Sequence, residues 1–260
     1  ELCTDPSVIA GYLKDASNLT GHAEALARPR TTAEVAEVVS RCQADRIPLT
    51  VTAQRTSTTG ASVPDGGWLL STERLTEICD VREERATVSA GWILGRFQEH
   101  AEDQGRYFPP DPTSRWDCSV GGAIACNASG ARSFHYGSIR RWIDAVEVVL
   151  PTGEIRRVDR STPIPENWRV PDWRAPTQKN TAGYFHGDNL LDLLIGSEGT
   201  LGVITKAVVR FASRPDPLMG LMVFFNNSAG AVGAVSSIRS LKQQGSAWCA
   251  PLCLEYFDRY

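Results

Sequence analysis

The sequence lacks the features that mark several large classes of protein. None of its apolar runs approaches the roughly 18 residues that a membrane-spanning helix needs. Its N-terminal stretch, "ELCTDPSVIAGYLKDASNLTG", does not show a basic segment followed by an apolar one, as a secretion signal would. The formal net charge of -3 leaves no basic excess of the kind that general nucleic-acid binders carry. We therefore expect neither a transmembrane segment nor a nucleic-acid partner.

Motifs for metal and nucleotide binding are also missing. The four histidines are dispersed, with no HxxxH or HExxH, and the close pair Cys249 and Cys253 lacks CxxC spacing. We therefore predict no metal site. No GxGxxG opens a helix and no GxxxxGK[ST] occurs, which excludes Rossmann and P-loop nucleotide sites. The seven cysteines are odd in number and scattered, which favours buried thiols in a reducing compartment, and we expect a cytoplasmic protein.

The chain of 260 residues is long enough for one large domain or two smaller ones. Thr31 and Glu34 form a capping box before the apolar stripe of Val35, Val38, Val39 and Cys42, which predicts a helix that ends near Pro48. The stretch "DAVEVVL-PTGE-IRRV" predicts a hairpin in which Pro151 and Gly153 supply the turn. Further strands are expected within 49–51, 68–72, 86–91 and 203–211, and further helices within 93–105 and 189–196. After a linker at 213–217, the pattern predicts a strand at 218–225, a helix at 228–245 and a strand at 253–258.

Three loops between these elements are rich in glycine and in serine or threonine: 53–61, 111–130 and 196–202. Any one of them is compatible with an ordinary turn. Together they suggest a binding site, because backbone N–H groups in such turns form concavities that bind anions. Hydroxyl groups add donors without adding charge. An acidic protein that binds a diphosphate would need a neutral, dipolar site of this kind.

Four segments give the chain a family resemblance. They are "TSTTGASVP", "FPPDPTSRWDCSVGGAIACNASGARSFHYG", "VEVVLPTGEI" and "KNTAGYFHGDNLLDLLIGSEGTLGVIT". In their order they resemble the FAD-binding domain of the vanillyl-alcohol oxidase and p-cresol methylhydroxylase type. Within that type they are most similar to the glycolate oxidase and D-lactate dehydrogenase branch of FAD-linked oxidases. The resemblance covers about residues 20–213, and residues 218–260 are similar to the first unit of that branch's cap domain.

The resemblance implies that the small-residue turns bind FAD, with residues 53–59 as the pyrophosphate loop and Gly121 and Gly122 letting the chain turn closely beneath the cofactor. The residues it implies for the cofactor are Ala53, Gln54, Arg55, Thr56, Ser57, Thr58, Thr59, Gly60, Pro112, Thr113, Ser114, Asp117, Cys118, Ser119, Gly121, Gly122, Ala125, Cys126, Asn127, Ala128, Gly130, Tyr136, Gly137, Glu198, Gly199, Gly202, Val203 and Ile204. It assigns no catalytic residue to this chain. Such residues, and any metal ligands, are expected beyond Tyr260, so residues 1–260 alone should be inactive.

The chain departs from the family at one place. Where relatives commonly carry a run of glycines before "TS", it has Ala53, Gln54 and Arg55. If the family backbone needs φ > 0 there, each residue is strained by about 1 kcal/mol or more. Arg55 either contacts a phosphate, as charge-assisted bonds allow, or lies in solvent and weakens FAD binding. The family's covalent attachment positions hold no histidine, and Cys118 matches a cysteine of the non-covalent branch, so we expect non-covalent FAD.

For the fold, the resemblance implies an α+β FAD-binding domain over 1–213, with a smaller subdomain to about residue 75 and a larger one over 76–213. Residues 214–260 would begin a ferredoxin-like cap domain. His135 and His186 are each left open between a place near the flavin and a place at the surface.

For function, the resemblance implies an FAD-dependent oxidoreductase that oxidises a 2-hydroxy acid by hydride transfer to the flavin. Two alternatives remain: an FAD-dependent transferase like alkylglycerone-phosphate synthase, or a non-catalytic subunit of a larger oxidase complex. A small-molecule substrate is expected. An electron-acceptor protein and a second copy of the chain are left open as partners.

Overall fold

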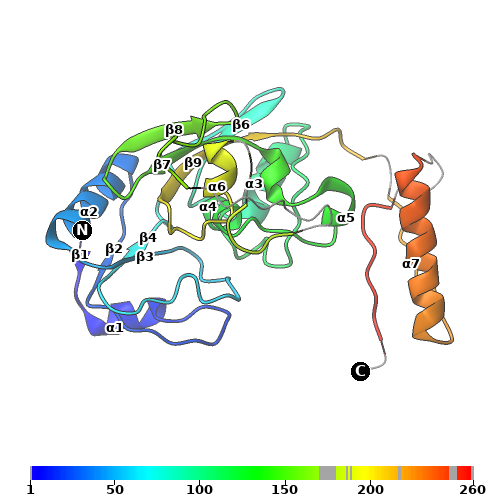
Figure 1. The fold of residues 1–260 in the computed structure, drawn as a ribbon, viewed down its shortest axis with the longest axis horizontal. Coiled ribbons are helices and arrows are strands. Elements are labelled where there is room, and N and C mark those ends of the chain that lie inside the picture. The colour runs from blue at the N-terminus through cyan, green and yellow to red at the C-terminus, as the bar shows by residue number, and fades with distance from the viewer. Residues whose placement is uncertain are drawn as a thin grey trace.

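The computed structural model describes residues 2–169, 180–185, 187, 189–215, 218–245 and 251–258. His186 and Cys249 lie outside these ranges. Within them the chain builds two β-sheets, one from residues 2–71 and one from residues 79–210, with helices packed on them (Figure 1). This is the α+β fold that the sequence predicts.

The first sheet has four strands: β1 (Leu2–Cys3), β2 (Ala25–Ala27), β3 (Leu49–Thr52) and β4 (Trp68–Ser71). Their spatial order is β1-β2-β4-β3; β4 runs parallel to both β2 and β3, whereas β1 is antiparallel to β2. The short helices α1 (Pro6–Ile9) and η1 (Ala10–Tyr12) cover it, and Ile9 and Tyr12 are buried against Leu26 and Leu69. The parallel arrangement places the carboxyl ends of β3 and β4 side by side.

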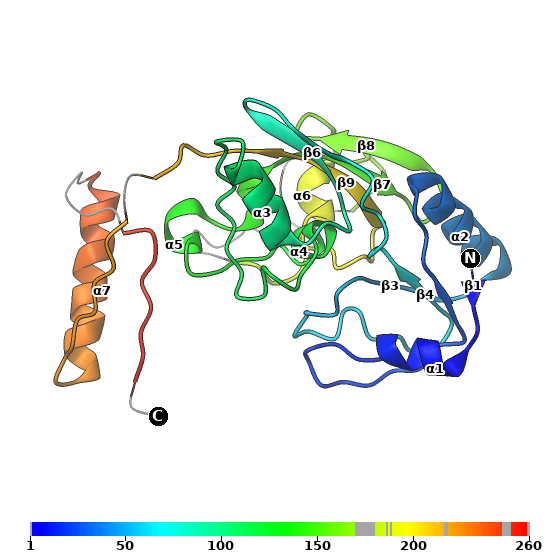
Figure 2. The same cartoon turned by 180° about the vertical axis from the view of Figure 1, so that it is seen from behind.

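The second sheet is antiparallel throughout, in the order β5-β6-β9-β7-β8. Its strands are β5 (Cys79–Val81), β6 (Arg85–Ser89), β7 (Ile143–Val149), β8 (Ile155–Asp159) and β9 (Val203–Arg210). The helices on it are α3 (Leu94–Glu102), α4 (Val120–Ala125), α5 (Ser133–Tyr136), η2 (Ile139–Trp142) and α6 (Leu190–Leu194). Figure 2 shows α3, α4 and α6 gathered against one face, where their apolar side chains form the largest core with the strands. The expected hairpin is β7–β8.

The helix expected from the capping box is α2 (Thr32–Asp45), and it joins the two sheets. Thr31 Oγ1 accepts the Glu34 N–H at 3.2 Å, and the Glu34 carboxylate accepts the Arg30 N–H at 2.7 Å. The helix ends because Arg46 adopts a left-handed conformation with φ 56°, two residues before Pro48. Its buried stripe packs against strands of both sheets; this shared core contains Val35, Val39, Leu70, Leu75, Ala90, Val149 and Val203.

The C-terminal segment differs from the prediction. The expected helix forms as α7 (Ser228–Gln243), but residues 218–225 and 253–258 form no strands. A strand needs a neighbour for its backbone hydrogen bonds, and none of the described residues pairs with these two segments. Their large apolar side chains are exposed accordingly, with Phe224 87% and Phe257 81% accessible. In Figure 1, α7 stands apart from the two sheets.

The remaining expectations from composition concern the cysteines and membrane-spanning helices. Every cysteine within the described ranges is a free thiol, with Cys42 and Cys118 buried and Cys253 exposed. None of the helices within those ranges combines the length and the apolar character that crossing a bilayer requires.

The junction between α2 and the second sheet carries a half-buried carboxylate, that of Glu147. It accepts hydrogen bonds from Thr32 Oγ1 at 2.6 Å and Thr205 Oγ1 at 2.9 Å, and it pairs with Lys206 Nζ at 3.0 Å. Burial disfavours the charged form, but these donors outweigh it and hold the pKa of Glu147 below its usual value. The folded state therefore binds this proton less readily than the unfolded chain does.

This predicts an acid-dependent loss of stability that Glu147→Gln removes in part. The stabilisation is complete above the ordinary glutamate pKa of 4.5 and is lost as the pH falls through the lower, folded-state value. At neutral pH the free energy of unfolding of Glu147→Gln should be about 1–2 kcal/mol lower than that of wild type, because the variant loses charged hydrogen bonds. Urea unfolding of both proteins at several pH values measures this. Glu154→Gln, on the exposed hairpin turn, is the control. Equal pH dependence in wild type and Glu147→Gln would contradict the assignment.

Candidate functional site

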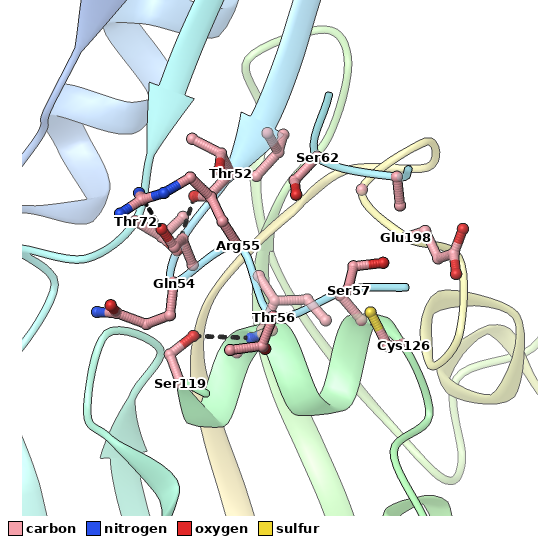
Figure 3. Close-up of a pocket in the computed structure, with 18 of the residues that line it drawn as sticks. Thr52, Gln54, Arg55, Thr56, Ser57, Ser62, Thr72, Ser119, Cys126 and Glu198 are labelled. Atoms are coloured by element: carbon pink, nitrogen blue, oxygen red, sulfur yellow. Dashed lines mark hydrogen bonds between the residues drawn. The ribbon is translucent and has the colours of Figure 1, made fainter. Parts of the chain in front are cut away.

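A pocket lies where the loops of the two sheets meet (Figure 3). It holds about 670 Å³ of atom-free space, a figure that includes the part open to solvent. The residues that line it are Val51, Thr52, Ala53, Gln54, Arg55, Thr56, Ser57, Ala61, Ser62, Thr72, Ser119, Gly121, Gly122, Ala125, Cys126, Glu198, Gly199, Gly202 and Ile204. All three glycine- and hydroxyl-rich loops of the sequence therefore contribute to one pocket.

The loop that follows β3 offers free hydrogen-bond donors to this pocket. The backbone N–H groups of residues 54–58 donate to no acceptor among the described residues. The buried hydroxyl oxygen of Thr52, at the end of β3, likewise has no partner within the described part of the chain. Buried polar groups are normally paired, so an unpaired hydroxyl beside a row of unpaired amides indicates a site for a ligand rich in acceptor atoms.

The floor of the pocket is the short helix α4 and the residues at its ends. Ser119 caps the helix by accepting the Gly122 N–H at 3.1 Å. Gly121 permits close packing, since a Cβ there would lie 2.5 Å from the Cβ of Ala90. At the other end, burial, followed by the nearby Glu198 carboxylate, raises the pKa of the Cys126 thiol to about 11. Cys126 is therefore protonated at neutral pH and is not a nucleophile.

The third wall is the turn at residues 196–202 with the start of β9, and hydrogen bonds attach the turn to α4. The N–H groups of Gly196 and Glu198 donate to the carbonyl oxygens of Ile124 and Ala125, at 3.1 and 2.9 Å. Glu198 and Gly199 take positive φ values of 54° and 83°. The Glu198 carboxylate accepts from Thr59 Oγ1 at 3.1 Å, and this bond bridges the turn and the loop after β3.

A buried ion pair stabilises the segment before this turn. Arg140 pairs with Asp192 at 3.1 Å and also donates to the Asp192 and Ile195 carbonyl oxygens. Arg160 pairs with the same carboxylate at 2.8 Å. Burial lowers the pKa of Arg140, although Asp192 opposes that shift. The pair fixes α6, and hence the start of the turn, to the second sheet.

About half of the residues expected to contact the cofactor line this pocket. The others lie around it or farther away: Thr58, Thr59, Gly60, Pro112, Thr113, Ser114, Asp117, Cys118, Asn127, Ala128, Gly130, Tyr136, Gly137 and Val203. Cys118, Asn127 and Val203 are buried in the protein interior. Gly130 has a packing role, because a Cβ there would lie 1.6 Å from the Asp111 carbonyl oxygen. Tyr136 borders a separate surface hollow with His135, Arg141, Trp142 and Arg210.

The sequence reasoning missed five residues of the lining: Val51, Thr52, Ala61, Ser62 and Thr72. A signal for two of them was present. Thr52 and Thr72 follow the apolar runs of β3 and β4, and the Thr72 N–H donates to the Thr52 carbonyl at 2.9 Å. Ligands of parallel sheets commonly bind beyond the carboxyl ends of adjacent strands, which is where these threonines lie.

The altered glycine run proves less strained than expected. Of Ala53, Gln54 and Arg55, only Arg55 has a positive φ, at 58°. Its guanidinium does not lie free in solvent: Nη1 donates to the Ala53 carbonyl at 2.8 Å, and the group stacks 4.5 Å from the centre of the Tyr12 ring. Arg55 and Glu198 are the only charged residues in the described lining, so the pocket is close to neutral.

These features fit a diphosphate-containing cofactor, and comparison with known proteins identifies the family. Residues 23–159 match the family model described as "FAD binding domain". The chain belongs to this FAD-binding family. The match confirms the resemblance seen in the sequence and the cofactor inferred from it. The matched region contains all of the pocket lining except Glu198, Gly199, Gly202 and Ile204.

Curated relatives extend the match beyond that region. The chain is 34% identical to a D-lactate dehydrogenase of Anaerostipes hadrus over 91% of its length and 45% of the relative's. It is 30% identical to glycolate oxidase subunit GlcD of Bacillus subtilis (strain 168), over 91% of this chain and 46% of that protein. It is 31% identical to a D-2-hydroxyglutarate dehydrogenase of Xanthomonas citri pv. viticola, over 99% of this chain and 49% of that protein. The chain thus spans about half the length of these relatives.

Solved structures support the fold. A structure of alkyldihydroxyacetonephosphate synthase superposes with a TM-score of 0.70 over 93% of this chain and 46% of that one. The sequence identity is 20%, so this likeness concerns the fold alone. It confirms the architecture expected for this type of FAD-binding domain.

The unpaired Thr52 hydroxyl predicts opposite effects of Thr52→Val on stability and on FAD binding. Valine keeps the shape and removes an unsatisfied polar group, so the FAD-free protein should be as stable as wild type or up to about 1 kcal/mol more stable. FAD affinity should fall by about fivefold, which is the effect of losing one neutral hydrogen bond. Thermal unfolding and a fluorescence titration with FAD measure the two effects.

Thr50→Val, in the same strand but outside the pocket lining, is the matched control and should leave FAD affinity unchanged. If Thr52→Val binds FAD as tightly as wild type, the Thr52 hydroxyl is not part of the cofactor site.

Proposed function

We propose that this chain forms the FAD-binding part of an oxidoreductase that oxidises a 2-hydroxy acid. The observation that carries the proposal is the meeting of the three glycine- and hydroxyl-rich loops around one near-neutral pocket. The printed names of the relatives supply the substrate class, since lactate, glycolate and 2-hydroxyglutarate are all 2-hydroxy acids. The structural likeness to alkyldihydroxyacetonephosphate synthase concerns the fold and does not favour the transferase alternative.

In this proposal the unpaired amides of residues 54–58 bind the diphosphate of FAD. The ligand would lie on α4, against the small side chains from Ser119 to Cys126, and under the turn from Glu198 to Ile204. Glycines in the lining let backbone atoms approach it closely. The other residues expected from the family, such as Pro112 to Ser114 and Tyr136, would contact parts of FAD that extend out of the pocket.

FAD, when bound, supplies the hydride acceptor, and the protein supplies binding and orientation. This chain's residues fix the cofactor between the two sheets and exclude water from it. The thiol of Cys126 in the pocket stays protonated and is not a nucleophile. We therefore assign no catalytic residue to this chain. We propose that the groups that bind and deprotonate the substrate lie in the part of the relatives' length that this chain does not span. We also propose a domain boundary near residue 213, with residues 214–260 belonging to a cap domain.

Partners and location follow from the same proposal. The substrate is a small molecule, and the reduced cofactor needs an electron acceptor, which is either a protein or a small molecule. The free thiols favour a reducing compartment such as the cytoplasm. Some relatives carry "mitochondrial" in their names.

The proposal predicts which form of the protein a substrate can reduce. Residues 1–260 loaded with FAD should keep their visible flavin absorbance when D-lactate, glycolate or D-2-hydroxyglutarate is added without oxygen. A form that covers the whole length of the relatives should lose that absorbance with at least one of them, since it adds the substrate-binding groups. Anaerobic absorbance spectroscopy measures this.

L-lactate and succinate are the controls, because the first reverses the configuration and the second lacks the hydroxyl. A longer form that binds FAD but is reduced by none of a panel of 2-hydroxy acids would contradict the proposal. In that case an FAD-dependent transferase or a non-catalytic subunit becomes the better account.

A further inference from the structure

Arg55 combines an unfavourable backbone conformation with a central place in the site. Its φ of 58° lies in the left-handed region, which a long, non-glycine residue rarely adopts. It is the second of the five consecutive residues, 54–58, whose amides have no acceptor in the described part of the chain. Something must hold this residue in place if the loop is to keep one conformation, because the amides themselves form no internal hydrogen bonds.

The side chain of Arg55 provides that support. Its guanidinium donates to the Ala53 carbonyl at 2.8 Å, which closes the loop on itself, and it stacks on the Tyr12 ring at 4.5 Å. The Arg55 carbonyl oxygen accepts the Ala16 N–H at 3.1 Å. Both side chain and backbone therefore attach the loop to the N-terminal segment that carries η1.

Tyr12 is itself held firmly. It is 9% exposed, and its hydroxyl donates to Glu73 Oε1 at 2.5 Å. Glu73 follows β4 and lies 3.8 Å from Arg28 Nη1. The ring on which Arg55 stacks is thus fixed to the first sheet, and neither Tyr12 nor Glu73 lines the pocket.

The direction of the side chain argues against a role in phosphate binding. In Figure 3 the guanidinium of Arg55 points away from Ser57, Cys126 and Glu198. A contact with a ligand beside those residues would break both the hydrogen bond to Ala53 and the stacking on Tyr12. These two contacts stabilise the left-handed backbone of Arg55, which would then lose its support.

We propose that Arg55 is a positioning residue for the cofactor: its contacts with Tyr12 and Ala53 hold the loop in the left-handed conformation that glycine would otherwise provide. FAD affinity then depends on Tyr12, a residue outside the pocket. The inference rests on the proposed binding of FAD by residues 54–58.

Three variants of Arg55 separate this role from a charge role. Arg55→Gly should bind FAD within about threefold of wild type, because glycine adopts positive φ without support. Arg55→Ala should bind about tenfold more weakly, since alanine has neither the conformational freedom nor the contacts. Arg55→Lys should also weaken binding, because an ammonium group cannot hydrogen-bond to Ala53 and stack on Tyr12 with the same planar geometry. Fluorescence titration with FAD gives the three dissociation constants.

A charge role predicts the reverse order. Arg55→Lys would then keep its affinity, and Arg55→Gly would lose as much affinity as Arg55→Ala. That result would overturn the proposal.

A double-mutant cycle tests the coupling to Tyr12. Tyr12→Leu should weaken FAD binding about tenfold in the wild-type background and less than threefold in the Arg55→Gly background, where no stacking partner is needed. Tyr12→Phe keeps the ring but loses the hydrogen bond to Glu73, so in the wild-type background it should weaken FAD binding less than Tyr12→Leu does, and in the Arg55→Gly background it should have little effect. Equal losses from Tyr12→Leu in both backgrounds would reduce Tyr12 to a merely structural role and contradict the coupling.

The same proteins distinguish a failure of this inference from a failure of the proposed function. If wild type does not bind FAD, the proposed function fails. The cycle is then measured by thermal unfolding without FAD. If the melting-temperature shifts of the two single variants do not add up to that of the double variant, the contact between Arg55 and Tyr12 is supported. Additive shifts overturn it.

Discussion

The pocket depends on the close approach of three backbone segments, and above all on the attachment of the 196–202 turn to α4. Two backbone hydrogen bonds make this attachment, from Gly196 to Ile124 and from Glu198 to Ala125. Such an approach requires small residues. A Cβ on Gly199 would lie 3.2 Å from the Val51 side chain, and one on Gly202 would lie 2.8 Å from that of Val148. The first contact joins this turn to β3 of the first sheet, and the second packs it on β7 of the second sheet. Together with the two hydrogen bonds, they position the wall of the site that the turn forms.

The distribution of charge follows from the same arrangement. The buried or half-buried charges that hold the framework, Arg140 with Asp192 and Glu147 with Lys206, lie away from the pocket lining. Among the described residues, the lining itself carries one cation and one anion, each engaged with the protein: Arg55 with Tyr12 and Ala53, and Glu198 with Thr59. Unpaired amides and hydroxyls are left to interact with a ligand. A dipolar site of this kind lets an acidic protein bind a diphosphate without a cluster of basic side chains.

Much of this could be predicted from the sequence, because the local signals agree with the final contacts. The capping box at Thr31, the β7–β8 hairpin and the three loops needed only nearby residues to be recognised. The sequence predicted strands at 218–225 and 253–258 wrongly, since a strand forms only with a neighbour and a short apolar run does not say whether one is present. The role of Tyr12 was also beyond sequence reasoning. Its contact with Arg55 joins two segments that are distant in the sequence and leaves no periodic or motif signal.

The most direct test of the account is the hydrogen exchange of the backbone amides of residues 54–58, measured with and without FAD. These amides have no acceptor among the described residues, so they should exchange rapidly in the free protein and become strongly protected when FAD binds. Protection should extend to the peptides that contain Ser119 to Cys126 and Gly196 to Gly202. If FAD binds and these amides still exchange as in the free protein, the cofactor does not occupy this pocket and the account is wrong.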